Sequence, residues 1–110
     1  MKLYQAILAG CQLSEQGFGN DGMVGTKRCA LGAALRVLAP EIQVDFEGYG
    51  FLSKMYPTID LSEVYARNDG VMAHTRKWSR EEIAHWLRNN VEGGAAEEAT
   101  PAKELVCLPS

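Results

Sequence analysis

The chain has 110 residues, a length that suits one domain and leaves little room for a second. Hydrophobic residues make up 46% of it and charged residues 23%, which is the composition of an ordinary globular protein. The net charge of −3 argues against a nucleic-acid-binding protein, because a duplex binder must neutralise several phosphates. The sequence contains no apolar run long enough to span a membrane.

The three cysteines, Cys11, Cys29 and Cys107, show neither the even number of a disulfide framework nor the C-x-x-C spacing of a zinc site. The loops also lack the acidic pattern of a calcium site and the glycine pattern of a phosphate-binding loop. We therefore expect reduced thiols in a cytoplasmic protein, and we expect no metal or other cofactor.

Two helices are predicted in the first third of the chain. Apolar residues at four-residue spacing predict the first of them over residues 2–15. Residues 27–39 are apolar on nearly every side, which is typical of a buried central helix, with Thr26 as its N-cap and Pro40 at its end. The small residues at 32–34 would let a neighbouring helix approach closely.

The pattern changes in the middle of the chain. Apolar and polar residues alternate over 42–46, which predicts a short strand, although the sequence offers it no partner strand. Gly48 and Gly50 are expected in turns. Residues 51–56 are expected to form one or two helical turns, which Pro57 ends.

Two more helices are predicted in the second half. Apolar residues at positions i, i+3 and i+4 indicate a helix that begins at Thr58 or Asp60 and that the Asn-Asp-Gly sequence of 68–70 closes. Ser79 and Glu82 have the spacing of a capping box, in which each side chain bonds a backbone amide of the helix start. The last helix therefore begins directly after Ser79.

Together these elements predict an all-α fold, a compact bundle of four to five helices with residues 29–39 and 80–90 in its interior. Three short motifs of residues 13–28 recur in residues 61–77 at a nearly constant offset. This repetition indicates two helix–loop–helix hairpins, or else only the common chemistry of turns.

Cys29 is the best candidate for a catalytic group. It follows two basic residues at the start of a helix, where backbone amides and cations lower the pKa of a thiol. His74 would be its base, and Asn68 or Asp69 would orient that histidine. The alternative is a buried and inert cysteine, which the apolar helix after Cys29 favours.

Two basic pairs, Lys27-Arg28 and Arg76-Lys77, precede the second and the last helix. They would bind an anion if they shared one face, and they are otherwise solvated loop charges. A set of aromatic residues would similarly either line a groove for a small ligand or a partner helix, or belong to the core. These are Tyr49, Phe51, Tyr56, Tyr65, Trp78 and Trp86.

The segment Cys29-Ala-Leu-Gly-Ala33 at a helix start, the later Asn68-Asp69 and the capped helix at Ser79–Leu87 resemble a family of small bacterial and phage proteins. The resemblance covers about residues 26–90. It implies a helical, cytoplasmic protein, encoded on a phage or another mobile element. The family has no established activity, so the resemblance implies no catalytic residues.

We expect residues 1–91 to form the helical domain and residues 92–110 to form a linker and a tail that docks on the domain or on a partner subunit. The leading prediction is a non-enzymatic binding or interaction module that forms a homodimer and binds a protein or a small molecule. The alternatives are a cysteine-dependent hydrolase or transferase that uses Cys29 and His74, and an anion or nucleic-acid binder that uses the basic pairs.

Overall fold

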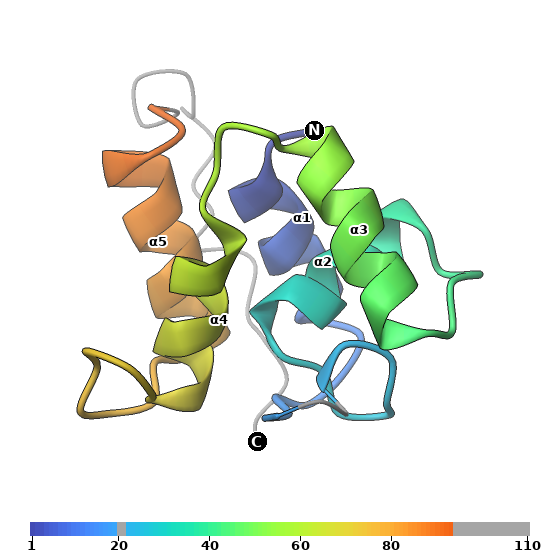
Figure 1. The fold of residues 1–110 in the computed structure, drawn as a ribbon, viewed down its shortest axis with the longest axis horizontal. Coiled ribbons are helices and arrows are strands. Elements are labelled where there is room, and N and C mark those ends of the chain that lie inside the picture. The colour runs from blue at the N-terminus through green and yellow to red at the C-terminus, as the bar shows by residue number, and fades with distance from the viewer. Residues whose placement is uncertain (20–21, 94–110) are drawn as a thin grey trace.

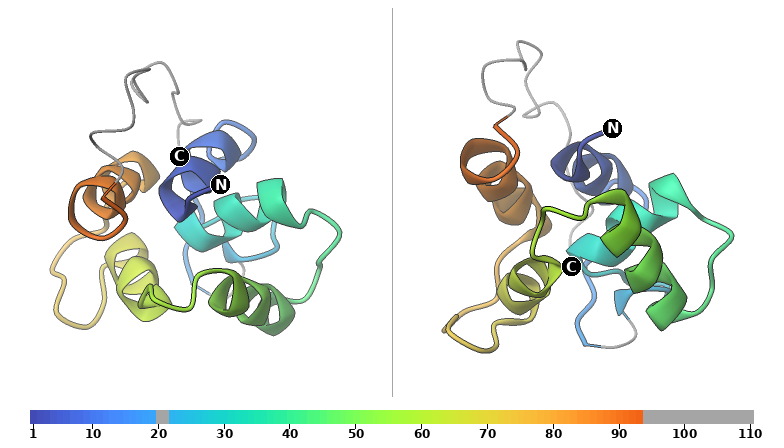
Figure 2. Two further views of the ribbon diagram at one scale, coloured as in Figure 1. Left: turned by 90° about the horizontal axis from the view of Figure 1, so that it is seen from above. Right: turned by 45° about the horizontal axis from the view of Figure 1, so that its top comes forward.

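The computed structural model describes residues 1–19 and 22–93, which form an all-α domain without strands. Its five helices are α1 (Leu3–Gly10), α2 (Ala30–Leu38), α3 (Asp45–Met55), α4 (Leu61–Asp69) and α5 (Arg80–Asn90). Helix α1 packs between α2 and α5, and α2 also contacts α3 and α4 (Figures 1 and 2). The predicted all-α fold is therefore confirmed, and residues 94–110 of the linker and tail predicted over 92–110 lie outside the described residues. None of the described helices is long and apolar enough to cross a membrane.

Helix α1 is buried on most sides, and it ends at Gly10 instead of extending to residue 15 as predicted. Its N-terminus has no acidic residue in the first turn. A carboxylate from the other end of the domain takes that place: the amides of Leu3 and Tyr4 donate to Glu92 at 2.7 and 2.8 Å. Glu92 thus satisfies two of the amides that every helix start leaves without a partner.

Helices α1 and α2 cross at Gly10 and Ala33 with their backbones in contact. A Cβ atom added to Gly10 would lie 1.8 Å from the carbonyl oxygen of Ala33. The close approach expected of the small residues in the second helix is therefore confirmed, and it requires a glycine on the opposing helix.

Helix α2 begins at Ala30, with Cys29 as its N-cap in place of the predicted Thr26. The reason is that the backbone before it is engaged elsewhere. The amide of Arg28 donates to the carbonyl of Glu15, and the amide of Gly17 donates to the carbonyl of Arg28. These bonds hold the chain extended until residue 29, so the helix cannot begin earlier.

The predicted strand at 42–46 is wrong, because α3 begins at Asp45 and extends over eleven residues. The alternation of apolar and polar residues does not mark a buried face: Val44 and Phe46 are 38% and 73% exposed. The two glycines expected in turns lie inside this helix. Gly48 is one of its two buried residues, and a Cβ atom there would lie 2.5 Å from the Leu35 side chain, so the glycine brings α3 against α2.

The ends of α4 and α5 confirm the predictions from local sequence. Asp60 caps α4, and Gly70 follows it with a φ of 69°, the left-handed conformation that a glycine adopts readily. Ser79 and Glu82 form the capping box of α5. Arg80, the first residue of α5, is 1% exposed, and its guanidinium donates to carbonyl oxygens of the loop after α1, among them that of Ser14 at 2.6 Å.

The cysteines differ from one another in state. Cys29 is free and buried, as predicted. Cys11 is disulfide-bonded, so the prediction of a reduced thiol is wrong for this residue. Cys107 lies outside the described residues. Because disulfides are rare in the cytoplasm, the cysteines no longer support the predicted cytoplasmic location.

Candidate functional site

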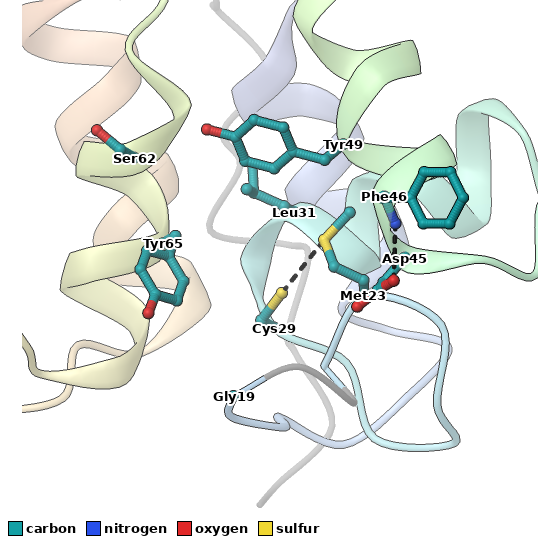
Figure 3. Close-up of a pocket in the computed structure, with 9 residues that line it drawn as sticks. All are labelled: Gly19, Met23, Cys29, Leu31, Asp45, Phe46, Tyr49, Ser62 and Tyr65. Carbon is teal, nitrogen blue, oxygen red and sulfur yellow. Dashed lines mark hydrogen bonds between the residues drawn. The ribbon is translucent and has the colours of Figure 1, made fainter.

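A cavity of about 430 Å³ opens between α3 and α4, and we call it the α3–α4 cleft. The start of α2 and the loop before it form its floor, while α3 and α4 form its walls (Figure 3). Its volume lies within the range of roughly 300–1,000 Å³ that is common for small-molecule sites. The lining residues are Gly19, Met23, Cys29, Leu31, Asp45, Phe46, Tyr49, Ser62 and Tyr65.

Helical spacing places the wall residues. Asp45 and Tyr49 are four residues apart on α3, and Ser62 and Tyr65 are three apart on α4, so each pair lies on one face of its helix. Tyr49 points from α3 toward α4 in Figure 3. The cleft therefore depends on residues 45–55 being helical, because the helix places Asp45 and Tyr49 on the same face.

The floor and the rim of the cleft differ in exposure. Met23 and Leu31 on the floor are only 8% and 1% exposed, so the floor is apolar and closed. The three aromatic side chains of the cleft are all exposed, namely Phe46 at 73%, Tyr49 at 39% and Tyr65 at 41%. An apolar hollow with exposed aromatic rings at its mouth is a surface that gains from being covered.

Cys29 lies on the floor of the cleft with its thiol protonated. Burial is the main cause that raises the pKa of this thiol to about 11; the amide of Gly32, which donates to its sulfur at 3.4 Å, opposes that shift, and the charge of Asp69 adds to it. The thiol also contacts the Met23 sulfur at 3.9 Å. This environment does not produce a thiolate at neutral pH.

The predicted catalytic residues are only partly brought together. Asn68 and Asp69 lie near the start of α2, because the Asn68 side chain accepts the amide of Ala30 at 3.1 Å. His74 has other partners: its Nε2 lies 3.5 Å from a Glu63 carboxylate oxygen, and its ring meets Trp78 edge-on. The thiol and the imidazole thus have separate partners, and neither activates the other.

Asn68 is a structural residue in this arrangement. Its side chain is fully buried, and it accepts from the amide group of Gln16 while it donates to the carbonyl of Gly17 and to Asp69. Together with its bond to Ala30, these contacts join α4 to the loop after α1 and to α2. A buried side chain with every polar group occupied has no capacity left for a substrate.

The four basic residues predicted to bind an anion all have partners inside the protein. Lys27 pairs with Glu15 at 3.4 Å, and Arg28 is buried with its guanidinium on carbonyl oxygens of residues 23–25 and Gly32. Arg76 makes two hydrogen bonds to Glu82, and the Lys77 ammonium lies over the Phe18 ring. A second hollow, of about 670 Å³, touches only Lys27 among the four, so an anion would have to compete with the existing partners.

Part of the cleft could be predicted from the sequence. Of the six aromatic residues proposed to form either a groove or the core, Tyr49 and Tyr65 line the cleft. Trp78 and Trp86 instead stack with Arg67, whose guanidinium carbon lies 5.3 and 3.7 Å from their ring centres. The prediction missed Met23, Asp45, Phe46 and Ser62; a helical interpretation of residues 45–55 would have aligned Asp45 with Tyr49.

The chain matches no protein-family model, no curated protein and no solved structure. The resemblance to small bacterial and phage proteins therefore stays a prediction. Among the described residues, no three histidine, cysteine or acidic side chains gather to hold a metal ion.

Proposed function

We propose that this protein is a binding module that takes an apolar ligand in the α3–α4 cleft. One observation supports the proposal most directly: an apolar floor lies beneath the exposed rings of Tyr49 and Tyr65, which come from two different helices. Exposed rings around a preformed hollow gain free energy when a ligand removes them from water.

Cysteine chemistry is a weaker candidate for the same place. Cys29 lines the cleft, but its raised pKa leaves almost no thiolate at neutral pH, and His74 is paired with Glu63. Binding needs neither group to react. The cleft therefore supports a binding function better than a cysteine-dependent hydrolase or transferase.

Titration with phenylbutanol, an uncharged arylalkyl probe, tests the proposal by nuclear magnetic resonance. We expect saturable chemical-shift changes at the amides of Leu31, Tyr49 and Tyr65. The variant Ser62→Trp places a large ring in the cleft and should abolish them. Asn89→Trp adds the same ring at an exposed position of α5 and should leave them unchanged. Failure of the probe to bind, or equal binding to both variants, would contradict the proposal.

The homodimer predicted from the sequence is a separate part of the proposal. A domain this small gains stability by association, and the exposed apolar side chains on α3, among them Phe46 and Met55, offer surface for it. Size-exclusion chromatography with light scattering tests it, and a monomer at all accessible concentrations would contradict it.

A further inference from the structure

The lining of the α3–α4 cleft carries negative charge. Among the described residues that line it, Asp45 is the only charged one. This residue is the first of α3, is half-buried, and its carboxylate accepts the amide of Phe46 at 2.8 Å. The basic residue of α3, Lys54, lies in the last turn, at the opposite end of the helix.

Two further carboxylates are attached to the lining through hydrogen bonds. Asp60 accepts from the hydroxyl and the amide of Ser62, and Asp69 accepts from the amide of Gly19 at 3.1 Å. The Ser62 hydroxyl is the main cause that lowers the pKa of the Asp60 carboxyl, so that this group is ionised at neutral pH. Three carboxylates therefore adjoin the cleft, one in its lining and two bonded to lining residues, whereas a single cation is bonded to the lining in the same way, the Arg28 guanidinium on the carbonyl of Met23 at 3.2 Å.

These carboxylates have no basic partner within residues 1–19 and 22–93. Other acidic residues of the molecule do have one: Glu15 pairs with Lys27, Glu63 with Arg67 and His74, and Glu82 with Arg76. The three around the cleft form no such ion pair in this part of the chain. The Arg28 guanidinium donates to carbonyl oxygens of residues 23–25 and Gly32 and pairs with none of the three carboxylates, so negative charge is in excess beside the apolar floor.

The aromatic rings show the same contrast. Elsewhere the protein covers ring faces with its own cations: Arg67 lies over Trp86, Arg76 over Trp78 and Lys77 over Phe18. Within the described residues, no basic side chain lies over Phe46, Tyr49 or Tyr65, the rings of the cleft. Their faces carry partial negative charge, which attracts a cation that arrives from outside.

Building on the proposed binding function, we infer that the ligand of the α3–α4 cleft is a small organic cation, an ammonium group on an apolar body. The apolar part would cover Met23 and Leu31, and the ammonium would lie between Asp45 and the tyrosine rings. The cleft has the volume of a small-molecule site, and its floor is recessed behind the side chains of α3 and α4, which favours a small ligand over a flat protein surface.

Three probes of one size test the charge preference: phenylbutylamine, phenylbutanol and phenylbutyrate, titrated at low ionic strength and neutral pH. We expect the amine to bind about tenfold tighter than the alcohol, because ring faces and a nearby carboxylate each favour a cation. We expect phenylbutyrate to bind more weakly than either. The preference for the amine should shrink as salt is added.

Matched variants locate the preference. Asp45→Asn should reduce it to within about threefold, because the lining charge is lost while the shape is retained. Glu47→Gln removes one charge from the same first turn of α3 at an exposed position outside the lining, and should keep the preference. The affinity for the alcohol serves as the folding control, since neither variant should change it.

The outcomes separate this inference from the function on which it rests. If the alcohol binds in the cleft and the amine binds no tighter, the inference is overturned and the binding function stands. If the two variants keep the same preference, the inference is also overturned. If neither the alcohol nor the amine binds, both the inference and the proposed function are overturned.

Discussion

The domain contains two pairs of helices that are packed in opposite ways. Helices α1 and α2 are in direct contact, whereas α3 and α4 are separated by a cleft. At the first, the backbones touch and no methyl group fits between Gly10 and Ala33. At the second, aromatic side chains hold an open hollow of about 430 Å³. The first region buries the large apolar side chains that meet there, among them Leu3, Ile7 and Leu35, whereas the second leaves its rings exposed.

This difference indicates a division of tasks. The closely packed region stabilises the domain, so changes there should unfold it. The cleft lies on top of that region and shares only its floor with the core, so changes to its rim should alter binding and leave the fold intact. The following variants break or sharpen the contrast, from the largest expected effect to the smallest.

Gly10→Ala should cost the most. Its methyl group would overlap the Ala33 carbonyl, so the two helices must separate, which lowers the free energy of unfolding by about 3 kcal/mol. The control is Gly50→Ala in the interior of α3, where a Cβ atom meets nothing within 4 Å. That variant should instead gain up to about 1 kcal/mol. Urea unfolding of both measures the difference, and equal stability would refute the close contact.

The reactivity of the Cys29 thiol reports how closed the floor of the cleft is, where the cleft meets the core. Because its pKa is raised from 9.0 to about 11, its thiolate fraction at neutral pH should be about 100-fold below that of an ordinary thiol. Iodoacetamide should therefore label it slowly in the native protein, faster as the pH rises toward that pKa, and at the ordinary rate once urea unfolds the chain. Rapid native labelling at neutral pH would revive the cysteine-dependent alternative.

Asn68→Ala probes the joint between the two regions. The substitution leaves the Ala30 amide and the Gly17 carbonyl without their partner, and should cost about 2 kcal/mol. Asn89→Ala, at an exposed position, should change stability by less than about 0.5 kcal/mol. Thermal unfolding followed by circular dichroism compares them, and similar melting temperatures would show that Asn68 is not the structural residue described above.

Ser79→Ala should have the smallest effect. It removes the side-chain half of the α5 capping box, at a cost of about 1 kcal/mol. Ser53→Ala, at an exposed position of α3, should be nearly neutral. Both variants should keep the affinity of the cleft for phenylbutanol, since α5 contributes no lining residue. A loss of binding in Ser79→Ala would show that the cleft depends on the core more than its position suggests.

Structure set by near neighbours could be predicted from the sequence. The capping box of Ser79 and Glu82 and the glycine after α4 act within a few residues, and both were found. The alternation of apolar and polar residues over 42–46 gave a wrong prediction of a strand. Such an alternation over five residues indicates a strand only when the apolar residues lie on one buried face. Here Val44 and Phe46 are both exposed.

Structure set by distant partners could not be predicted in the same way. An asparagine in this sequence context is compatible with a catalytic role or with a turn. Only the contacts of Asn68 with Gln16, Gly17 and Ala30 reveal its structural role. The cleft likewise collects side chains from the loop after α1, from α2, α3 and α4. A linear pattern does not encode which of these segments meet.

The carboxylate of Glu92 on the first turn of α1 also constrains how the protein is made. The group that satisfies the amides of Leu3 and Tyr4 lies at the far end of the domain, so it leaves the ribosome after every helix. The first helix to be synthesised is consequently the last to receive its cap. A chain stalled or truncated before residue 92 would hold all five described helical sequences and still lack this closing contact, so the domain should complete its folding only after Glu92 has been synthesised.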